Sequence, residues 1–585
     1  MGTISDKLMR IINTKEDIRQ ALISKGYDVP TSIPFKEYAK MILDLPCKVD
    51  SFPDIEGIVA RYYASGLTNE QMAANPVWVD KTGNGHDIQL KNFSWKGMSG
   101  VGGYVQDFND FRNNATVDKI RIDEQGSNSI KVTILTTGIG NAIYIPKNIY
   151  QFNKSYFIKI SSEGYNEGDL SLSFYAPSTS TATTVTVSLN PNGITEIPAI
   201  KEDGFLAVYI NVSGKVGSFT VEQLPLYPGA LVFDGVDDYG VCENFPILTK
   251  EKGYTVVALR QWITYNPNVI SAIATNASDR SFNGAFTFEN YNKGAEQTIS
   301  HGATQISLQY SKSPFSWQTT SKYNGVNIAN GNKDATNSLV LGRSYPQRND
   351  FANFAIWELV FLDHDATEEE LTKIKDYFVK TYPWLFFDQA WTVTGKTNED
   401  EDRATIANIT GNGNDLILSN FGFAEGSGYN EEGEYAGYLV TDGVDDKVQS
   451  SSFTMNEDWT IVGDWELLSN VQINCGIVKS QNVYLYNTAN GLLISINNPR
   501  SLQSFGTKSL HAICSDGRLY DRNWVEYEYT VDQNFAIVES SLNIGFNLNN
   551  YTQIAFKNLG IYNNQILYKD DCIKAYNYLQ TLKAK

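Results

Sequence analysis

Hydrophobic and polar residues alternate with a period of two along most of this 585-residue chain, which is typical of β-strands with one buried face. The alternation is clearest between residues 105 and 228, where turn residues separate the alternating stretches by about ten to fifteen residues. These stretches are 129–135, 156–160, 170–175, 184–187 and 206–210. Short strands at this spacing predict that residues 105–228 form a compact β-sandwich.

The first 45 residues follow a helical pattern instead. Apolar residues recur there at the four-three spacing of an amphipathic helix or short coiled coil, at Ile4, Leu8, Ile11, Ile18 and Leu22. Lys15 interrupts this row, and a capping box at 14–17 predicts a division into two helices. So short a segment cannot bury a core of its own. Residues 1–45 are therefore predicted to be a docking or oligomerisation module, with a helical cap on the next domain as the alternative, and residues 46–56 a linker.

Two more helices are predicted further along the chain. At 368–382 the apolar residues Leu371, Ile374 and Phe378 recur at helical spacing, and Pro383 ends the pattern. Near the C-terminus, 569–582 carries apolar residues at a similar spacing, at Ile573, Tyr576 and Leu579. Each predicted helix closes a long region of strand-like sequence.

A set of short motifs occurs twice in the same order, with the register between the copies constant from Thr82 and Thr410 to Gly100 and Gly428. The motifs are Thr-Gly-Asn-Gly at 82–85 and 410–413, Asp-Gly-Val-Asp-Asp at 234–238 and 442–446, and a late strand ending in Gly342 or Gly545. The repetition predicts a duplicated domain. The first copy comprises 57–104 plus 229–385, the second 389–585, and 105–228 is inserted into the first.

The charge, the apolar stretches and the cysteines of the chain limit the kinds of partner and cellular compartment that we expect. The net charge is −19, which argues against nucleic acid, because phosphates require clustered Lys and Arg. No stretch approaches the roughly 20 apolar residues of a membrane span. The five cysteines are scattered without metal-ligand spacing or a paired framework. The first residues lack a basic region followed by an apolar run, so a signal peptide is not expected. We therefore expect synthesis and assembly in a reducing cytoplasm.

The repeated motifs resemble the concanavalin A-like, laminin-G-type jelly roll. The resemblance rests on the Gly-Asn-Gly turn, the Phe-Asp-Gly-Val-Asp-Asp-Tyr segment at 233–239, the Leu-Gly-Arg-Ser segment at 341–344 and the closing helix from Thr367. It implies a mainly all-β fold of two jelly rolls, one with an inserted sandwich like a carbohydrate-binding module, behind a short helical module. Such scaffolds host lectins, hydrolases and inert spacers, so the fold alone does not imply an activity.

The N-terminal segment resembles the opening of virion fibre and appendage proteins from phages of Bacteroidales hosts, including crAss-like phages. The matching residues are Ile4-Ser5-Asp6-Lys7-Leu8, then Thr14-Lys15, Ile18 and Ala21, then Lys25-Gly26, Phe35, Tyr38-Ala39 and Ile42. The resemblance implies attachment to other virion proteins, of the capsid or the tail. With the apolar row it predicts a homo-oligomer, a trimer or dimer, that is made in the host cytoplasm and incorporated into the virion.

No catalytic or cofactor-binding residue is predicted. Residues 390–397 satisfy a loose phosphate-loop pattern, but an acidic run follows where a helix N-terminus should face the phosphates. The Glu-x-Asp-x-Glu spacing of jelly-roll glycosidases is absent. The four histidines, His86, His301, His364 and His511, are isolated. The protein is therefore predicted not to be an enzyme.

Two acidic clusters have two interpretations. Their residues are Asp234, Asp237, Asp238, Asp442, Asp445 and Asp446. Asp-Gly and Asp-Asp form turns by side-chain-to-backbone bonds, whereas hard carboxylate oxygens also suit calcium. We favour structural turns, with calcium as the alternative and no other cofactor. Trp95, Trp262, Trp317, Trp391 and Trp524 occur in loop-like sequence, where they would either stack on sugars or fill the core.

These observations predict a structural virion protein, a head or tail fibre or appendage. It would attach through its N-terminus and display lectin-like domains to host-surface or mucus glycans. The alternative hypothesis is a glycan-degrading depolymerase or glycoside hydrolase on the same scaffold.

Overall fold

The computed structural model describes residues 52–584 with gaps, and the longer gaps are 150–155, 176–182, 198–203, 265–270, 278–286, 299–305, 308–313, 328–334, 469–475, 497–502 and 529–537. The predicted helical module 1–45, with Ile4, Leu8, Ile11, Ile18 and Leu22, lies outside the described residues. Residues from Ile55 onward form one compact unit. Among the described residues, no helix is long and apolar enough to cross a membrane.

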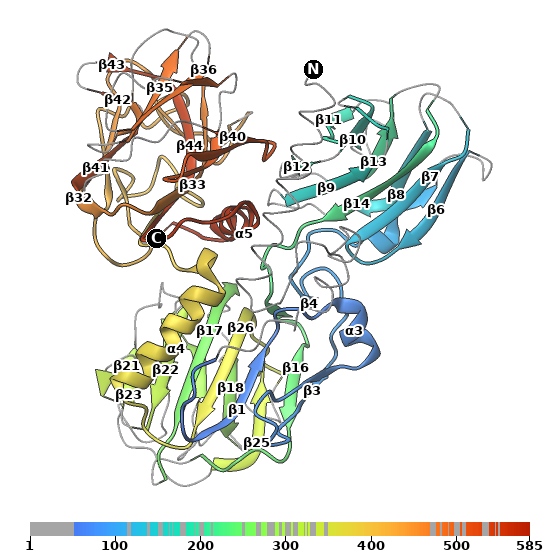
Figure 1. The fold of residues 1–585 in the computed structure, drawn as a ribbon, viewed down its shortest axis with the longest axis vertical. Coiled ribbons are helices and arrows are strands. Elements are labelled where there is room, and N and C mark those ends of the chain that lie inside the picture. Colours follow the sequence, from blue (N-terminus) through green and yellow to red (C-terminus); the bar gives the residue numbers. More distant parts are fainter. Residues whose placement is uncertain are drawn as a thin grey trace, which may run out of the picture. The chain divides into compact units, whose positions relative to one another are not determined.

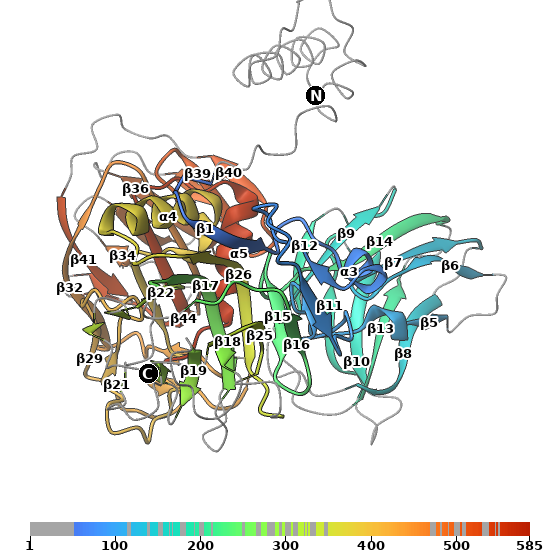
Figure 2. The same ribbon diagram turned by 90° about the horizontal axis from the view of Figure 1, so that it is seen from below.

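The first repeat is a β-sandwich of two antiparallel sheets, and we keep the name jelly roll from the sequence resemblance as a label for each repeat. One has the strand order β24-β23-β22-β17-β26-β15-β4, and β1 also pairs with β26. Its strands are β1 (Ile58–Tyr63), β4 (Gly100–Val101), β15 (Leu231–Asp234), β17 (Thr255–Thr264), β22 (Phe315–Thr319), β23 (Lys322–Tyr323), β24 (Val326–Asn327) and β26 (Asn353–Leu362). The central strands β17 and β26 run side by side in both views (Figure 1 and Figure 2).

The second sheet of this jelly roll has the order β2-β3-β16-β25-β18-β19-β20-β21. Its strands are β2 (Val77–Trp78), β3 (Ile88–Lys91), β16 (Tyr239–Cys242), β18 (Ser271–Ala277), β19 (Thr287–Tyr291), β20 (Ala295–Thr298), β21 (Ile306–Ser307) and β25 (Ala335–Leu341). One hydrophobic core, which includes Tyr62, Ile88, Leu341 and Ile356, joins residues of both sheets. Each sheet therefore buries one face, as the alternating pattern requires.

The segment between β4 and β15 forms two further five-stranded sheets, with the orders β11-β10-β13-β8-β5 and β12-β9-β14-β7-β6. The strands are β5 (Arg112–Asn113), β6 (Ile120–Gln125), β7 (Ser129–Ile134), β8 (Asn141–Ile149), β9 (Tyr156–Ser162), β10 (Leu170–Tyr175), β11 (Thr183–Ser188), β12 (Ile194–Ile197), β13 (Gly204–Ile210) and β14 (Gly217–Gln223). Every alternating stretch identified in the sequence lies on one of them. Gln223 connects the first and last residues of the inserted segment. Its buried side-chain oxygen accepts hydrogen bonds from the backbone N–H groups of Val105 (3.2 Å) and Gln106 (3.0 Å).

The second jelly roll repeats the first. One sheet has the order β30-β31-β44-β33-β38-β39-β40 with β27 on β44, and the others are β28-β29-β32-β41, β34-β35-β36-β37 and β42-β43. The strands are β27 (Gln389–Thr392), β28 (Thr405–Ile406), β29 (Leu416–Ser419), β30 (Gly428–Tyr429), β31 (Leu439–Val440), β32 (Lys447–Met455), β33 (Trp459–Leu467), β34 (Gly476–Lys479), β35 (Val483–Thr488), β36 (Gly491–Ile496), β37 (Gln503–Phe505), β38 (Leu510–Cys514), β39 (Arg518–Asp521), β40 (Glu526–Glu528), β41 (Val538–Ile544), β42 (Phe546–Asn547), β43 (Asn550–Tyr551) and β44 (Ile554–Asn563).

Helices follow the last long strand of each jelly roll. α4 (Glu368–Thr381) begins at a capping box between Thr367 and Glu370 and buries Leu371, Ile374 and Phe378. α5 (Lys569–Gln580) buries most of its length. Both match the predicted helices to within about two residues at their ends, the usual uncertainty of such boundaries. A short helix that the sequence pattern did not predict, α3 (Asn69–Ala74), begins at a second capping box from Thr68 to Gln71.

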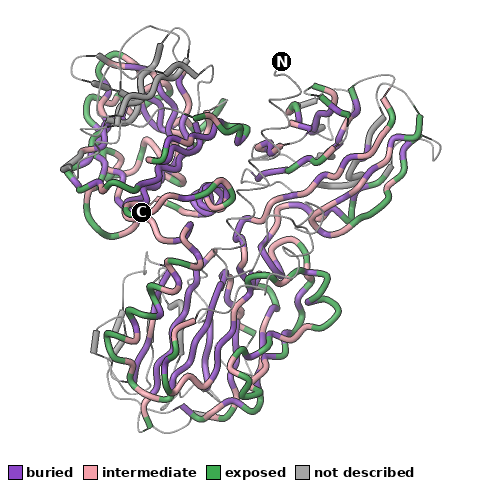
Figure 3. Tube along the Cα trace, in the orientation of Figure 1, coloured by how far each residue is buried: buried purple, intermediate pink, exposed green. Residues whose placement is uncertain are grey.

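The prediction of a mainly-β protein built from antiparallel sandwiches is confirmed for the described residues. Buried residues follow the strands of the sandwiches, while the turns between them are largely exposed (Figure 3). The finer prediction of a helical module ahead of them concerns residues that the structure does not describe.

Candidate functional site

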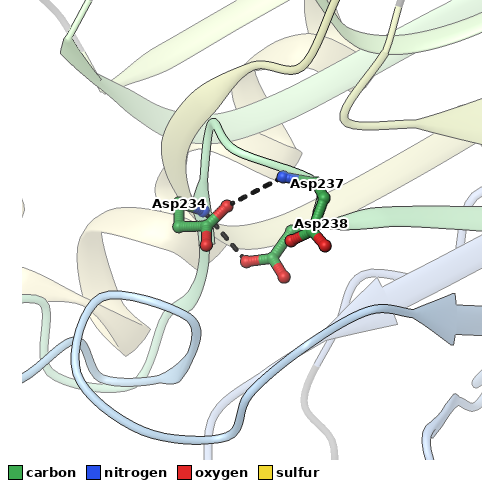
Figure 4. A group of neighbouring side chains, drawn as sticks. All are labelled: Asp234, Asp237 and Asp238. Atoms are coloured by element: carbon green, nitrogen blue, oxygen red, sulfur yellow. Dashed lines mark hydrogen bonds between the residues drawn. The ribbon is translucent and has the colours of Figure 1, made fainter. Parts of the chain in front are cut away.

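The Asp-Gly-Val-Asp-Asp motif of the first jelly roll is the turn between β15 and β16. Asp234 accepts hydrogen bonds from the backbone N–H of Val236 (2.7 Å) and Asp237 (3.4 Å), and Asp238 accepts one from the N–H of Asp234 (3.0 Å). Figure 4 shows the three carboxylates gathered on this turn. Gly235 has φ +76° and a Cβ there would lie 2.7 Å from Asn353 Cβ, so the turn requires glycine.

This turn also fixes the opening segment of the jelly roll. Ser99 Oγ donates to Asp238 Oδ1 at 3.0 Å, and the Asn92 side chain donates to the Asp237 carbonyl at 3.1 Å. The second copy repeats both contacts. Ser427 Oγ donates to Asp446 Oδ1 at 3.1 Å, and Asn420 donates to the Asp445 carbonyl at 3.0 Å. Contacts shared by both copies are the expected mark of a structural device.

One carboxylate oxygen from each aspartate of a triad lies within 4.8 Å of the other two, as calcium ligands would. Protein donors, however, already occupy both oxygens of Asp238. Burial raises the pKa of Asp238 to about 7 and that of Asp446 to about 6. The geometry therefore fits a hydrogen-bonded turn, and no observation assigns a metal to either triad.

A groove of about 650 Å³ lies immediately beyond the first turn, on the face of the sheet that points away from the core. Along β3, Ile88 and Leu90 are buried, whereas Gln89 and Lys91 face solvent. Pairing aligns Tyr239 of β16 with Lys91, and Val241 with Gln89. Because side chains alternate across a strand, these four residues form one surface.

Charged and polar residues complete the far end of the groove. Asp87 precedes β3 and Glu243 follows β16, each two residues beyond the last pair Gln89 and Val241, and both line the groove. Ser338 of β25 and Asn244 also contribute to the lining. The groove thus has an acidic end with Asp87 and Glu243 and an opposite end with Lys91 and Tyr239. Gln89 and Val241 lie between the two ends.

Arg343 closes the second end. Its guanidinium lies over the Tyr239 ring, 3.9 Å from Cζ to the ring centroid. Gly342, with φ +79°, permits this approach, because a Cβ would lie 2.8 Å from the Asp238 carbonyl oxygen and 2.8 Å from the Phe233 ring. Burial lowers the pKa of Arg343. Its Nε is buried and makes no hydrogen bond to any described residue.

The two jelly rolls differ in this groove. The positions of Gln89, Lys91, Tyr239, Val241 and Arg343 correspond in the second copy to Ile417, Ser419, Lys447, Gln449 and Phe546. Asp87, by contrast, is retained as Asp415. Asp87 accepts from the backbone of Asp80 at 2.8 Å and Asp415 from that of Asn408 at 2.7 Å. Asp87 therefore supports the fold in both copies, whereas these five groove residues are particular to the first.

The other sequence candidates do not form a site. The loose phosphate-loop match ends in a turn, and its Lys396 pairs with Asp402 at 2.6 Å. His511 is buried, and burial lowers its pKa to about 4. His86 and His364 belong to separate parts of the first jelly roll, and His301 lies outside the described residues. Trp262, Trp391 and Trp524 are buried, so they fill cores. Trp95 stacks on Phe93, with centroids 4.8 Å apart, and Trp317, tilted against Phe315, has centroids 5.5 Å apart.

Sequence reasoning did not identify Lys91, Tyr239, Glu243 or Arg343. The available signal was the comparison of the two repeats. On the solvent face of paired strands, these positions change between copies while the neighbouring turn residues remain.

No family model and no curated protein sequence matches the chain. Among solved structures, a sialidase of Trypanosoma rangeli bound to sialic acid is similar at 10% identity and TM-score 0.24, over 82% of this chain and 97% of that one. The tandem CBM22 domains of Paenibacillus barcinonensis Xyn10C match at 9% identity and TM-score 0.15, over 46% and 99%. The binding domain of botulinum neurotoxin DC with rat synaptotagmin II matches at 8% and 0.19, over 87% and 99%. Similarities this distant carry no functional argument.

Proposed function

We propose that the protein is a glycan-binding protein and that the groove of the first jelly roll is its binding site. The observation that carries this proposal is the juxtaposition of Tyr239, Arg343 and the solvent-facing residues of β3 on one open sheet face. Sugars present hydroxyl groups in fixed directions, and side chains such as Gln89 and Asn244 can both donate to and accept from them. The groove is polar and preformed, as such a ligand requires.

The groove favours binding over cleavage. Glycosidic hydrolysis requires two carboxyl groups about 5–10 Å apart, one of which acts as a general acid. Asp87 and Glu243 are the two carboxyl groups in the groove, but the retained backbone contact of Asp87 explains its presence without catalysis. The depolymerase hypothesis therefore depends on Glu243 and Asp87 acting together, and it is tested alongside binding below.

The wider biological role that we propose is that of a virion fibre or appendage protein. Its support is the resemblance of residues 1–45 to virion appendage proteins and of the two jelly rolls to lectin-like domains. In this proposal the N-terminal segment docks on other virion proteins, and the first jelly roll presents its groove to host-surface or mucus glycans.

A glycan array tests the proposed function. The full-length chain is compared with Tyr239→Ala and with Lys447→Ala, which changes the corresponding position of the second jelly roll. We expect the wild type and Lys447→Ala to bind the same glycans and Tyr239→Ala to lose them. Release of new reducing ends from a bound glycan, abolished by Glu243→Gln, would instead establish the hydrolase.

A further inference from the structure

We infer that the groove selects a glycan with an acidic group and that Lys91 and Arg343 hold this group. The inference rests on the proposed function, because it assumes that the groove binds a sugar. It begins from the polarity of the groove, which has cations at one end and carboxylates at the other.

The strand register sets this polarity. Lys91 is the cross-strand partner of Tyr239, whose ring carries the Arg343 guanidinium. Gln89 and Val241 form the next row, and Asp87 and Glu243 line the groove two residues further along their segments. Residues two apart on a strand are separated by about 7 Å, so roughly 13 Å separates the two charged ends. At this distance, with solvent between them, the carboxylates do not neutralise the cations.

Arg343 has no counter-ion among the described residues, in contrast to three of the other arginines. Among the described residues, Arg61 faces Glu358 at 2.5 Å, Arg518 faces Asp516 at 2.6 Å and Arg522 faces Glu466 at 3.2 Å. Neither Arg343 nor Lys91 has an ion pair with a described residue. An anionic ligand can therefore pair with this guanidinium without breaking an existing ion pair to a described residue.

The chemistry of this end matches a carboxylate or sulfate. A guanidinium is planar and presents parallel N–H donors to two oxygens of an anion, while the lysine ammonium acts as a mobile point charge. The Tyr239 ring contacts the guanidinium, with Cζ 3.9 Å from the ring centroid. At the other end of the groove, the carboxylates of Asp87 and Glu243 can accept hydrogen bonds from sugar hydroxyl groups and repel a second anion. The preferred ligand is therefore a sugar with one acidic group next to neutral hydroxyl-bearing residues, rather than a uniformly charged polymer.

The test uses an array that contains neutral, carboxylated and sulfated glycans. It is probed with the full-length wild type, Arg343→Gln, Lys91→Gln and the control Lys447→Gln. The strongest carboxylated ligand is then titrated beside its own methyl ester, which keeps the sugar and removes the charge. Arg343→Lys is included because it keeps the charge and loses the planar fork. Thermal melting of each variant confirms that it is folded.

We expect binding to concentrate on acidic glycans, whether carboxylated or sulfated, and to weaken roughly tenfold to a hundredfold in Arg343→Gln or on esterification. The affinity of Arg343→Lys should lie between those of the wild type and Arg343→Gln, and Lys447→Gln should bind like the wild type. Equal affinity for the acid and its ester, or unchanged binding by Arg343→Gln, would overturn the inference and leave glycan binding intact. A wild type that binds no glycan would overturn the proposed function itself.

Discussion

The guanidinium of Arg343 lies 3.9 Å above the ring of Tyr239, although more than a hundred residues separate them in the sequence. Two local features create this contact. The aspartate turn places Tyr239 at the start of β16, and the positive φ of Gly342 lets the chain pass close to the Asp238 carbonyl. The repeated, structural part of the domain thus positions residues that only the first copy possesses.

Replacing Glu358 should destabilise the first jelly roll strongly. Glu358 is buried, pairs with Arg61 at 2.5 Å and accepts a hydrogen bond from the Tyr382 hydroxyl at 3.1 Å. Glu358→Gln leaves the buried Arg61 guanidinium without a counter-charge, which costs about 3–5 kcal/mol. Glu369→Gln is the matched control, since its pair with Lys373 is exposed to solvent and is expected to contribute little to stability. Similar chemical denaturation midpoints for the two variants would contradict the assignment.

The aspartate turn should make stability depend on pH. Burial raises the pKa of Asp238 from 3.8 to about 7, so the folded state favours the protonated acid. Its stabilising contribution is present below about pH 4 and is lost as the pH rises toward 7, by an amount on the order of a few kcal/mol. Asp238→Asn should therefore gain stability relative to wild type between pH 5 and pH 8, as measured by thermal melting.

Calcium provides the control for this prediction. If the turn is structural, chelator and added calcium both leave the melting temperature at pH 8 unchanged. An increase of several degrees on calcium addition, lost in Asp238→Asn, would show that the triad is a metal site.

The inserted sandwich should fold alone. Its two five-stranded sheets have their own buried residues, among them Val132, Leu172 and Phe219. The Gln223 contacts to Val105 and Gln106 also lie within residues 105–228. We expect a 105–228 fragment to melt cooperatively and Gln223→Ala to lower its melting temperature. A fragment without a cooperative transition would mean that the sheets depend on the jelly roll.

Residues 1–45 should control assembly. The apolar row Ile4, Leu8, Ile11, Ile18 and Leu22 is predicted to pack against a partner or a second copy. Leu8→Asp combined with Ile18→Asp should leave both jelly rolls folded and reduce the mass measured by light scattering to that of the monomer, as should a 54–585 truncation. If the wild type and both variants share one mass and all enter particles, this segment is not the dock.

The sequence predicted the fold better than the site, for a physical reason. Strands, helices and the Asp-Gly turn depend on neighbours close in sequence, and their period and turn residues are visible there. The groove depends on strand pairing that joins β3 to β16 across an inserted sandwich. Aromatic residues illustrate the limit. Trp391 has a loop-like sequence context but is buried on β27, while the functional candidate Tyr239 directly follows a motif noted only for its turn.

A calorimetric titration of the full-length chain with its strongest array ligand tests the central claim most directly. If the groove of the first jelly roll is the binding site, the wild type and Lys447→Ala bind one ligand per chain with the same affinity, and Tyr239→Ala shows no binding. Two ligands per chain, or an unchanged isotherm for Tyr239→Ala, would contradict the assignment of the site to this groove.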